Sequence, residues 1–429
     1  MANSRIGVVG SGPGGLHLGL FLQKHGVTTT LYSERTADQI RASKLPNTAI
    51  HWWNVRKREA ELGVDHWEGG QIGNNIWVGL PDPLVIKGHF SAKSNIVDNR
   101  LYCATLLEDY IKRGGDVVYG AIQAEALVGL SEKHELVVIS SGKGSLTELF
   151  PRIPEFSLTA PKRRLCTGIY RGITNPQPEY LGVNMVPGTG ELYEMPFITF
   201  DGKHTALFFF VVPGGPWETV MATRYEDNPK KFNDTVLGIV SAHFPHIRER
   251  IRTSEFGLRS ALDYLQGAIT PTVRRAYAKL ANGKHVVAIG DLHCTNDPLM
   301  GQGVGCATNG AFVVGQAILD DGLAFDERFC TLVEEKMWSW TRDATAWNNH
   351  MIQVPPAPNT VDLIIAAAKN QTLADAFCDN FAAPSKNWNA LASLERSRNL
   401  LRVLGMDSPF TDAALASTAG AADSKRSVQ

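Results

Sequence analysis

Glycines near the N-terminus have the types and the spacing needed to bind the phosphates of a nucleotide. Residues 5–24 read RIGVVGSGPGGLHLGLFLQK, in which Gly10-x-Gly12-x-x-Gly15 stands between a β-type run and a helical one. Gly10 permits a tight turn, Gly12 lets the backbone approach a pyrophosphate, and Gly15 lets the helix pack closely on the strand. Gly14 lies in the same turn, and the helix N-terminus that follows attracts phosphate.

An acidic residue at the expected distance turns this weak pattern into a dinucleotide fingerprint. Glu34 follows Gly15 by nineteen residues, at the end of a second β-branched run, Thr28–Tyr32. Its carboxylate can accept hydrogen bonds from ribose hydroxyls, and Arg35 beside it is a further candidate contact for the cofactor. The strand, glycine turn, helix and second strand predict a βαβ unit that binds NAD or FAD.

The choice between NAD and FAD depends on a second motif, far along the chain. Residues 285–311 read HVVAIGDLHCTNDPLMGQGVGCATNGA: a buried strand, a loop with a proline, and a glycine-rich helix start. FAD is longer than NAD by a ribityl chain and a tricyclic ring, so it needs a second anchor. A carboxylate can bind a ribityl hydroxyl, and backbone N–H groups at a helix start can face the flavin ring. The sequence predicts FAD, with this anchor formed by Asp291, Pro298, Gly301, Gln302 and Gly303.

Strand and helix signals alternate in the first part of the chain, and hairpin signals and then helical spacing follow. A helix over Arg100–Arg113 and strands over Asp116–Tyr119 and Glu135–Ser140 extend the first βαβ unit into one sheet. Hairpin signals follow between residues 166 and 223, ending in a strand at Glu218–Ala222, and strands near 76–78 and 84–88 join that second sheet. Residues 325–404 have helical spacing.

These patterns predict an α/β fold built in four parts. The Ala/Ser/Gly-rich end of the chain, with no aromatic residue after position 412, predicts disorder. The predicted parts are a Rossmann-type FAD-binding domain (1–65, 100–165 and 270–325), an antiparallel-sheet substrate domain (66–99 and 166–269), C-terminal helices (326–410) and a disordered tail (411–429).

Composition excludes several classes of partner. A net charge of −1 and a pI near 6.9 leave no electrostatic footprint for nucleic acid. No segment approaches the roughly 18 uninterrupted apolar residues of a membrane span. The six cysteines are scattered without metal-ligand spacing, which predicts no metal site and a reduced, cytoplasmic compartment.

Several longer stretches carry a family resemblance that spans the chain to about residue 405. The glycine turn, Glu34 and residues 290–303 resemble the single-component aromatic hydroxylases and their relatives. The chain resembles more closely the oxygenase subunit of two-component styrene and indole monooxygenases. This resemblance runs through GGLHLGLFLQKHGV (14–27), KLPNTAIH (44–51), LQGAITP (265–271), DPLMGQG (297–303) and FCDNFAAPSKNWN (377–389).

The resemblance implies an aromatic-hydroxylase-like fold and a flavin monooxygenase. Reduced FAD would come from a separate NADH:FAD oxidoreductase, and one oxygen atom of O2 would pass to a small aromatic alkene such as styrene, with indole as the close alternative. The lack of one sequence motif agrees with a separate source of reduced FAD. Single-component hydroxylases carry an Asp-Gly motif after a strand near residues 140–160, whereas this chain has Ser141-Gly142. Whether the chain forms a homodimer stays open.

The resemblance also assigns site residues. It places Asn47 beside the flavin ring as a candidate catalytic residue, together with His51 and Gln302. Lys44 and Arg100 would neutralise the FAD pyrophosphate. Each has a structural alternative: Asn47 as a turn residue after a proline, His51 as a packed core histidine, and Arg100 in a surface ion pair.

Some residues depart from the family pattern or suggest rivals. Trp52 and Trp53 follow the KLPNTAIH motif, and Asn74 stands where a bulkier ring is expected, so the natural substrate stays open. Trp338-Ser-Trp340 resembles the W-x-W of flavin halogenases but lacks the Ile-Pro that follows it. A non-catalytic escort protein of the same fold is the other alternative, although such a protein needs no ribityl anchor.

Overall fold

The computed structural model describes residues 6–142, 144–320 and 324–426. It contains two large β-sheets, of which the first has six strands. The strands of this first sheet lie in the order β15-β16-β7-β1-β2-β6, all parallel except the edge strand β15. This is the Rossmann-type arrangement that the glycine fingerprint predicts. The strands are β1 (Ile6–Val9), β2 (Thr29–Ser33), β6 (Asp116–Tyr119), β7 (Leu136–Ile139), β15 (Tyr277–Lys279) and β16 (His285–Ala288).

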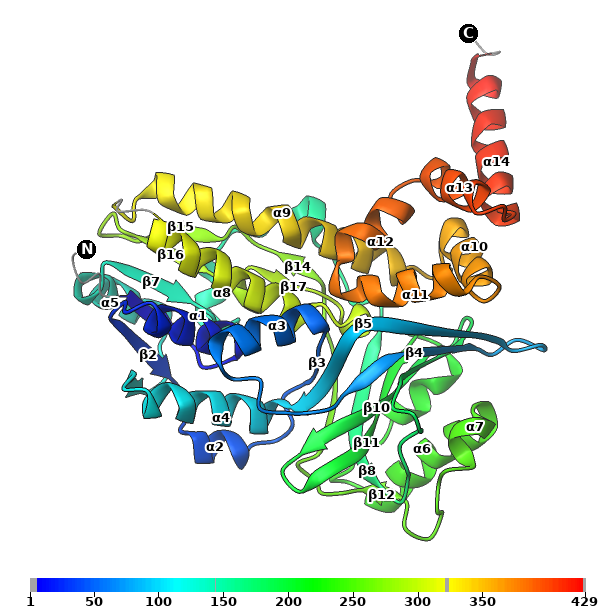
Figure 1. Ribbon diagram of the computed structural model, residues 1–429, viewed down its shortest axis with the longest axis horizontal. Helices are drawn as coiled ribbons and strands as arrows, with labels where there is room; N and C mark the ends of the chain where they lie inside the picture. The colour runs from blue at the N-terminus through cyan, green and yellow to red at the C-terminus, as the bar shows by residue number, and fades with distance from the viewer. Residues whose placement is uncertain (1–5, 143, 321–323, 427–429) are drawn as a thin grey trace.

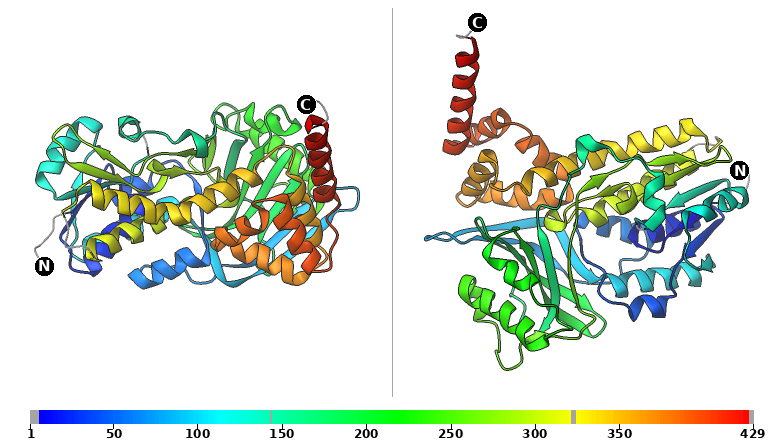
Figure 2. Two further views of the ribbon diagram at one scale, coloured as in Figure 1. Left: turned by 90° about the horizontal axis from the view of Figure 1, so that it is seen from above. Right: turned by 180° about the vertical axis from the view of Figure 1, so that it is seen from behind.

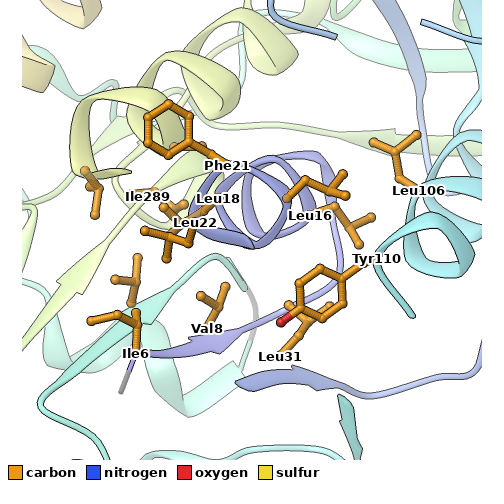
Figure 3. Packing of buried hydrophobic residues seen from close by; sticks show 14 of the residues in the cluster. Ile6, Val8, Leu16, Leu18, Phe21, Leu22, Leu31, Leu106, Tyr110 and Ile289 are labelled. Atoms are coloured by element: carbon orange, nitrogen blue, oxygen red, sulfur yellow. The ribbon is translucent and has the colours of Figure 1, made fainter. Parts of the chain in front are cut away.

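Helices cover both faces of this sheet, as a parallel sheet requires. On one face, apolar residues of β1 and β2 pack against α1 (Pro13–Lys24), α4 (Asn99–Lys112), α8 (Gly303–Asp320) and α9 (Glu327–Met351). Figure 3 shows α1 at the centre of this core, with Leu16, Leu18 and Leu22 around it. The other face packs against α5 (Leu127–Lys133) and a 3-10 helix, Gly144–Leu149.

The second sheet has nine strands and lies beside the first (Figure 1). Its order is β12-β8-β11-β10-β9-β4-β5-β3, with β13 also paired to β8. The predicted strands near 76–78 and 84–88 do join it. The strands are β3 (Thr48–His51), β4 (Gln71–Val78), β5 (Leu84–Asp98), β8 (Arg164–Arg171), β9 (Leu181–Val186), β10 (Gly190–Thr199), β11 (Gly202–Val211), β12 (Gly257–Leu258) and β13 (Tyr264–Ala268). A separate two-stranded ribbon pairs β14 (Thr272–Val273) with β17 (Cys294–Thr295).

Two groups of helices cover the second sheet. One apolar cluster joins it to α6 (Pro229–His243) and α7 (Pro245–Arg248). Another joins it to the C-terminal helices, on the opposite side in Figures 1 and 2. These are α10 (Pro358–Ala367), α11 (Gln371–Asp379), α12 (Pro384–Leu391) and α13 (Leu394–Val403). Two helices flank β3 in the chain: α2 (Ala37–Arg41) leads from the first sheet to β3, and α3 (Trp53–Leu62) leads from β3 to β4.

The structure corrects the predicted organisation at two places. Strand β3 pairs with β5 in the second sheet, although the predicted boundary assigns residues 1–65 to the FAD-binding part. Residues 216–221 form a 3-10 helix where a strand at Glu218–Ala222 is predicted. Pro216 begins this helix because its fixed φ suits a first helical position and its missing N–H cannot join a ladder.

The predicted tail is a third correction. Helix α14 (Pro409–Arg426) covers most of residues 411–429, and residues 427–429 lie outside the described residues. Alanine has the best helix propensity, and Pro409 and Asp412 suit the first turn. The buried carboxylate of Asp362 accepts hydrogen bonds from the N–H groups of Phe410 and Thr411, which holds the start of α14 against α10.

A buried histidine near the cofactor loop predicts a pH dependence of stability. The Nδ1 of His293 lies 2.7 Å from the carbonyl oxygen of Arg274, and the side chain is almost fully buried. Burial lowers the pKa of His293 to about 4. As pH falls below about 6.5, the unfolded chain therefore binds a proton before the folded chain does, and stability is lost down to about pH 4.

Between pH 7 and pH 4, the free energy of unfolding should fall by about 3 kcal/mol more in the natural protein than in His293→Gln. The variant keeps a donor for the Arg274 carbonyl but has no titrating ring. Urea unfolding at several pH values measures both curves. Parallel curves would show that His293 does not carry this part of the pH dependence.

Candidate functional site

A cavity of about 350 Å³ lies where the two sheets meet, and we call it the central cavity. The residues that follow β1, β2, β7 and β16 all contribute to its wall, so it stands at the carboxyl ends of parallel strands, where open α/β sheets bind ligands. Most of the predicted site residues line it: Gly10, Gly12, Gly14, Glu34, Arg35, Asn47, Arg100, Asp291, Pro298, Gly301 and Gly303.

One end of the central cavity has features that suit a phosphate group. Gly10 has a φ of +110°, which favours glycine. A Cβ on Gly15 would stand 1.9 Å from the carbonyl oxygen of Gly10, so only glycine fits between strand and helix. A Cβ on Gly12 would meet no protein atom within 4 Å. Gly12 caps α1 with no side-chain hydrogen bond, so the first N–H groups of the helix remain for an anion.

Two carboxylates line the cavity, each after a different strand of the first sheet. Glu34 lies just beyond β2 and Asp291 just beyond β16, and both are solvent-exposed and line the wall. The backbone of Asp291 is held in place because its carbonyl oxygen accepts a hydrogen bond from Thr295 Oγ1 at 2.7 Å. The two acids therefore come from different strand ends, as two separate anchors for one elongated ligand require.

The opposite end of the cavity is formed by β3 and the loop before α8. Gly301 has a φ of +61°, and a Cβ there would stand 2.5 Å from Ile50 Cγ2, so a larger residue would push the loop off the strand. Trp52 Nε1 donates to the Gly301 carbonyl at 2.9 Å. Tyr193 from the second sheet donates to the Leu299 carbonyl at 2.6 Å. The loop is thus fixed from two sides against a wall that includes Asn47.

Lys44 lies elsewhere than the predicted contact with the FAD pyrophosphate requires. Its ammonium group forms an ion pair with Glu226 at 2.7 Å and stands 3.9 Å from the ring centroid of Tyr264. It does not line the central cavity. Glu226 is 182 residues away in sequence, so no local pattern around Lys44 reveals this ion pair.

Arg100 lines the cavity but is fully bonded to protein. Its guanidinium pairs with Asp98 and Asp263, each at 2.6 Å, and also donates to the carbonyl oxygens of Ser43 and Leu262. A guanidinium has five N–H donors, and these partners occupy them. Arg100 thus forms a buried ion-pair network between the two sheets, in place of the surface ion pair considered from sequence. Because its donors are occupied, Arg35 is the other cation among the described lining residues that could bind a phosphate.

His51 lies behind the cavity wall. Its Nδ1 is 2.6 Å from Glu59 Oε1, which also accepts from the Tyr102 hydroxyl at 2.9 Å, and Tyr102 lies 2.6 Å from His17 Nε2. All four side chains are buried. Although burial raises the pKa of Glu59, the charges and hydrogen bonds of its neighbours, His51 foremost, bring it below its usual value. The structure thus favours the packed-histidine alternative and makes His51 a support for β3.

Gln302 is also buried and bonded to the backbone. Its Nε2 donates to the carbonyl oxygens of Met300 at 2.7 Å and Phe381 at 3.0 Å, and the side chain does not line the cavity. The amide ties the loop before α8 to the C-terminal helices. Its role in the structure is to position the loop, which differs from the catalytic role predicted.

Sequence reasoning missed several lining residues: Ser11, Ser140, Ser141, Ile269, Thr295 and Asn296. Three of them share a position, because Ser11, Ser140 and Ser141 follow β1 or β7 at the sheet edge where the fingerprint glycines also lie. Ser11 Oγ lies 2.7 Å from Ser33 Oγ, which links the first turn to the end of β2. Small polar residues at such edges are a usable indicator of a lining position.

The described residues fit FAD. A helix N-terminus without a side-chain cap, the space beside Gly12, and carboxylates after two different strands match the pyrophosphate and the two sugar-like parts of that cofactor. In the part of the chain that the structure describes, no three His, Cys, Asp or Glu side chains are grouped to hold a metal ion. Nor does any helix within those ranges have the length and apolarity to cross a membrane.

Replacing Asp291 by alanine should weaken FAD binding by about ten- to a hundredfold. A hydrogen bond to a charged group contributes roughly 1.5–3 kcal/mol, and the Asp291 side chain is exposed at the cavity wall. Titration of oxidised and reduced FAD against both proteins measures the effect, with the melting temperature as a control for folding. Equal dissociation constants would remove Asp291 from the site.

Comparison with solved structures shows the fold. The chain is similar to the flavin-dependent brominase Bmp2, with a TM-score of 0.61 and 14% identity over 92% of this chain and 100% of that one. It is similar to a flavoprotein/dehydrogenase from Cytophaga hutchinsonii, with a TM-score of 0.64 and 13% identity over 88% and 92%. A third is 2-methyl-3-hydroxypyridine-5-carboxylic acid oxygenase, with a TM-score of 0.57 and 16% identity over 91% and 96%.

The halogenase alternative gains nothing from this likeness, because at such identity it shows the fold alone. Trp338 and Trp340 lie on α9, away from the wall of the central cavity. Trp338 packs edge-to-face on Phe156 with ring centroids 4.6 Å apart. Both tryptophans belong to a small apolar cluster between α9 and the ribbon of β14 and β17.

Comparison of sequences shows the family. Residues 142–250 match the family model of the styrene monooxygenase A substrate binding domain. Styrene monooxygenase StyA of Pseudomonas sp. is 37% identical over 399 residues, which cover 91% of this chain and 96% of that protein. The StyA of Pseudomonas fluorescens is 36% identical over the same shares. The chain therefore belongs to the styrene monooxygenase family.

Proposed function

We propose that this protein is the oxygenase of a two-component system that epoxidises small uncharged aryl alkenes such as styrene. A separate NADH:FAD oxidoreductase supplies reduced FAD, which binds in the central cavity. The observation that carries the proposal is the chemistry of the cavity wall around β3 and the loop before α8. Within the described chain, this end is lined by Pro46, Asn47, Ala49, Ile50, Ile269 and Pro298, none of them charged.

An uncharged wall decides which substrates fit. A carboxylate or phenolate substrate needs a cation to offset the loss of its hydration. Lys44 is bound to Glu226 outside the cavity, and the guanidinium of Arg100 is held by Asp98 and Asp263. An apolar arene, in contrast, gains free energy by leaving water and needs only shape and packing. The site therefore favours a neutral aryl alkene.

The residues of this chain bind FAD, orient the alkene and shield the reacting groups from water. The α1 N-terminus and Arg35 hold the phosphates, and Glu34 and Asp291 hold the sugar-like parts. When bound, reduced FAD supplies two electrons, so that one oxygen atom of O2 enters the epoxide and the other leaves as water. The wall at β3 keeps the alkene at a fixed distance and excludes water, which limits the competing release of hydrogen peroxide.

Asn47 is the residue best placed to orient the reacting groups. It lines the cavity just before β3, and an amide donates and accepts hydrogen bonds without titrating. Asn47→Ala should raise the hydrogen peroxide released per FAD oxidised severalfold and lower the epoxide in proportion, while FAD affinity stays within about twofold.

The assay adds chemically reduced FAD, O2 and substrate to the natural protein, Asn47→Ala, and a control, Lys336→Ala, on the exposed face of α9. Styrene oxide is measured by chromatography, indigo from indole by absorbance, and peroxide by a coupled dye. Unchanged coupling in Asn47→Ala would remove its role. Ring hydroxylation of an anionic arene, with neither epoxide nor indigo formed, would overturn the proposed function.

A further inference from the structure

A second cavity, which we call the side cavity, has a volume of about 420 Å³ and lies between α9, α12 and residues 155–162. Figure 1 shows that α9 runs above the first sheet and that its C-terminal end lies next to α12. The volume falls in the range of roughly 300–1,000 Å³ typical of small-molecule sites. None of its lining residues also lines the central cavity.

The lining of the side cavity suits an apolar aromatic molecule. Phe156 and Trp388 provide two aromatic faces, and Leu158, Ala346 and Ile352 provide aliphatic surface. The charged residues that line it, Glu155 and Lys162, are exposed and therefore lie toward solvent. Aromatic rings bind other aromatic rings through offset or edge-to-face contacts. The side cavity thus has a largely apolar and aromatic lining with charged residues at its rim, and Thr345, Asn349, His350 and Gln353 add polar groups to it.

The wall between the two cavities is thin. Thr345 lines the side cavity, and its Oγ1 lies 3.2 Å from Cys294 Sγ. Asn296 lines the central cavity, and its Nδ2 lies 3.6 Å from the same sulfur. Leu158 of the side cavity and Ile269 of the central cavity both pack against one apolar cluster. One layer of side chains therefore separates the two spaces.

Polar atoms in this wall lack hydrogen-bond partners within the described residues. They include Asn296 Oδ1 and Asn349 Oδ1, and the side chain of Asn296 is buried. Buried polar groups without partners are rare in folded proteins. The Nδ2 of Asn296 donates to the sulfur atoms of Cys294 and Cys306 at 3.6 and 3.4 Å, and sulfur is a weak acceptor, so turning this side chain costs less than breaking hydrogen bonds to oxygen. The wall can therefore open at a lower cost than a fully bonded one.

The bound cofactor makes a second path necessary. If the proposed function holds, FAD extends from the α1 N-terminus to the loop before α8, which is the length of the central cavity. A substrate that must reach the loop end then cannot follow the path taken by FAD. The side cavity approaches the central cavity at Asn296, which is linked through Cys294 to Thr345 and stands two residues before Pro298.

We propose that the side cavity is the entrance through which small uncharged aryl alkenes reach the central cavity, separately from FAD. This inference rests on the proposed function and adds the route of the substrate. It predicts that residues of the side cavity control how fast styrene arrives, without touching either FAD or the reacting atoms.

Two variants block the entrance. Ala346→Trp fills the cavity from α9, and Gln353→Trp adds a ring at its exposed rim, where folding is little affected. Lys336→Trp adds the same ring to an exposed position of α9 outside the cavity and serves as the control. Both blocking variants should lose about tenfold or more in kcat/KM for styrene, whereas kcat at saturating styrene stays within about twofold.

The FAD dissociation constant should be unchanged in all three variants. A second measurement needs no turnover: stopped-flow mixing of styrene with the protein loaded with oxidised FAD, followed through the flavin absorbance, should give association about tenfold slower in the blocking variants. If Ala346→Trp does not fold, Gln353→Trp decides. Natural kcat/KM and natural association in a folded blocking variant would overturn the entrance. Styrene binding without any epoxide from the natural protein would instead overturn the proposed function.

Discussion

Mixed with NADH, O2 and styrene but no reductase, the purified protein is expected to oxidise NADH at no useful rate and to form no epoxide. The reason lies at the end of β7, where Ser140-Ser141-Gly142 lines the central cavity. The Asp-Gly motif that the single-component hydroxylases carry near this position is absent. We therefore expect the electrons to arrive on FAD that has been reduced elsewhere, as the proposed function requires.

Adding an NADH:FAD oxidoreductase, or FAD reduced chemically, should raise epoxide formation by about a hundredfold or more, equivalent to ~3 kcal/mol. The measurement follows NADH absorbance and styrene oxide together, with and without the reductase. A reductase supplied without this protein is the control, and it should consume NADH and yield hydrogen peroxide only. Sustained NADH consumption coupled to epoxide by this chain alone would contradict the two-component account.

Gly12→Val is expected to abolish FAD binding while leaving the protein folded. The backbone of Gly12 is extended, with a φ of −80° and a ψ of 178°, which any residue adopts. A Cβ there meets no protein atom within 4 Å and points into the space where a pyrophosphate would approach. We expect FAD affinity to fall by more than about a hundredfold, a loss of ~3 kcal/mol.

Gly15→Ala is the matched comparison, because its Cβ would overlap the carbonyl oxygen of Gly10. Overpacking of this kind costs about 1–3 kcal/mol, so Gly15→Ala should lower the melting temperature, whereas Gly12→Val should leave it unchanged. FAD titration and thermal unfolding of both variants separate the two effects. An unaltered FAD affinity in folded Gly12→Val would place the cofactor elsewhere.

The fold was predictable wherever local sequence determines the element. The glycine fingerprint, the spacing to Glu34 and the buried strand before Asp291 each follow from short-range chemistry, and the six-stranded sheet confirms them. Residues 48–51 were assigned with 1–65 to the FAD-binding part because nothing in them reveals that they form a strand of the second sheet. Their partner in that sheet is β5, whose paired residues lie at positions 95–98.

The site was predictable for backbone positions and less so for long side chains. Glycines are constrained by the turn that contains them, so Gly10, Gly12 and Gly301 line the cavity as predicted. Lys44 and Arg100 have flexible or charged ends that bind the strongest partner in reach. Those partners, on residues 226 and 263, are supplied by the second sheet and its connecting loops. No local pattern specifies them.

His51 and Gln302 show the same limit for buried polar residues. A histidine beside a cavity and a histidine behind its wall have the same sequence signature, and only the pairing with Glu59 distinguishes them. Gln302 binds the carbonyl oxygen of Phe381, which is 79 residues away. Both residues support the elements that form the cavity, so changes at either position should act through β3 or the loop before α8.

The most direct test of the central claim is a single turnover with ¹⁸O2. The protein is loaded anaerobically with reduced FAD and styrene, then mixed with ¹⁸O2 in unlabelled water, and styrene oxide is analysed by mass spectrometry. We predict styrene oxide with one ¹⁸O atom in nearly every molecule, in an amount close to the bound FAD. Styrene oxide without the label, or oxidised FAD with only hydrogen peroxide, would contradict the account.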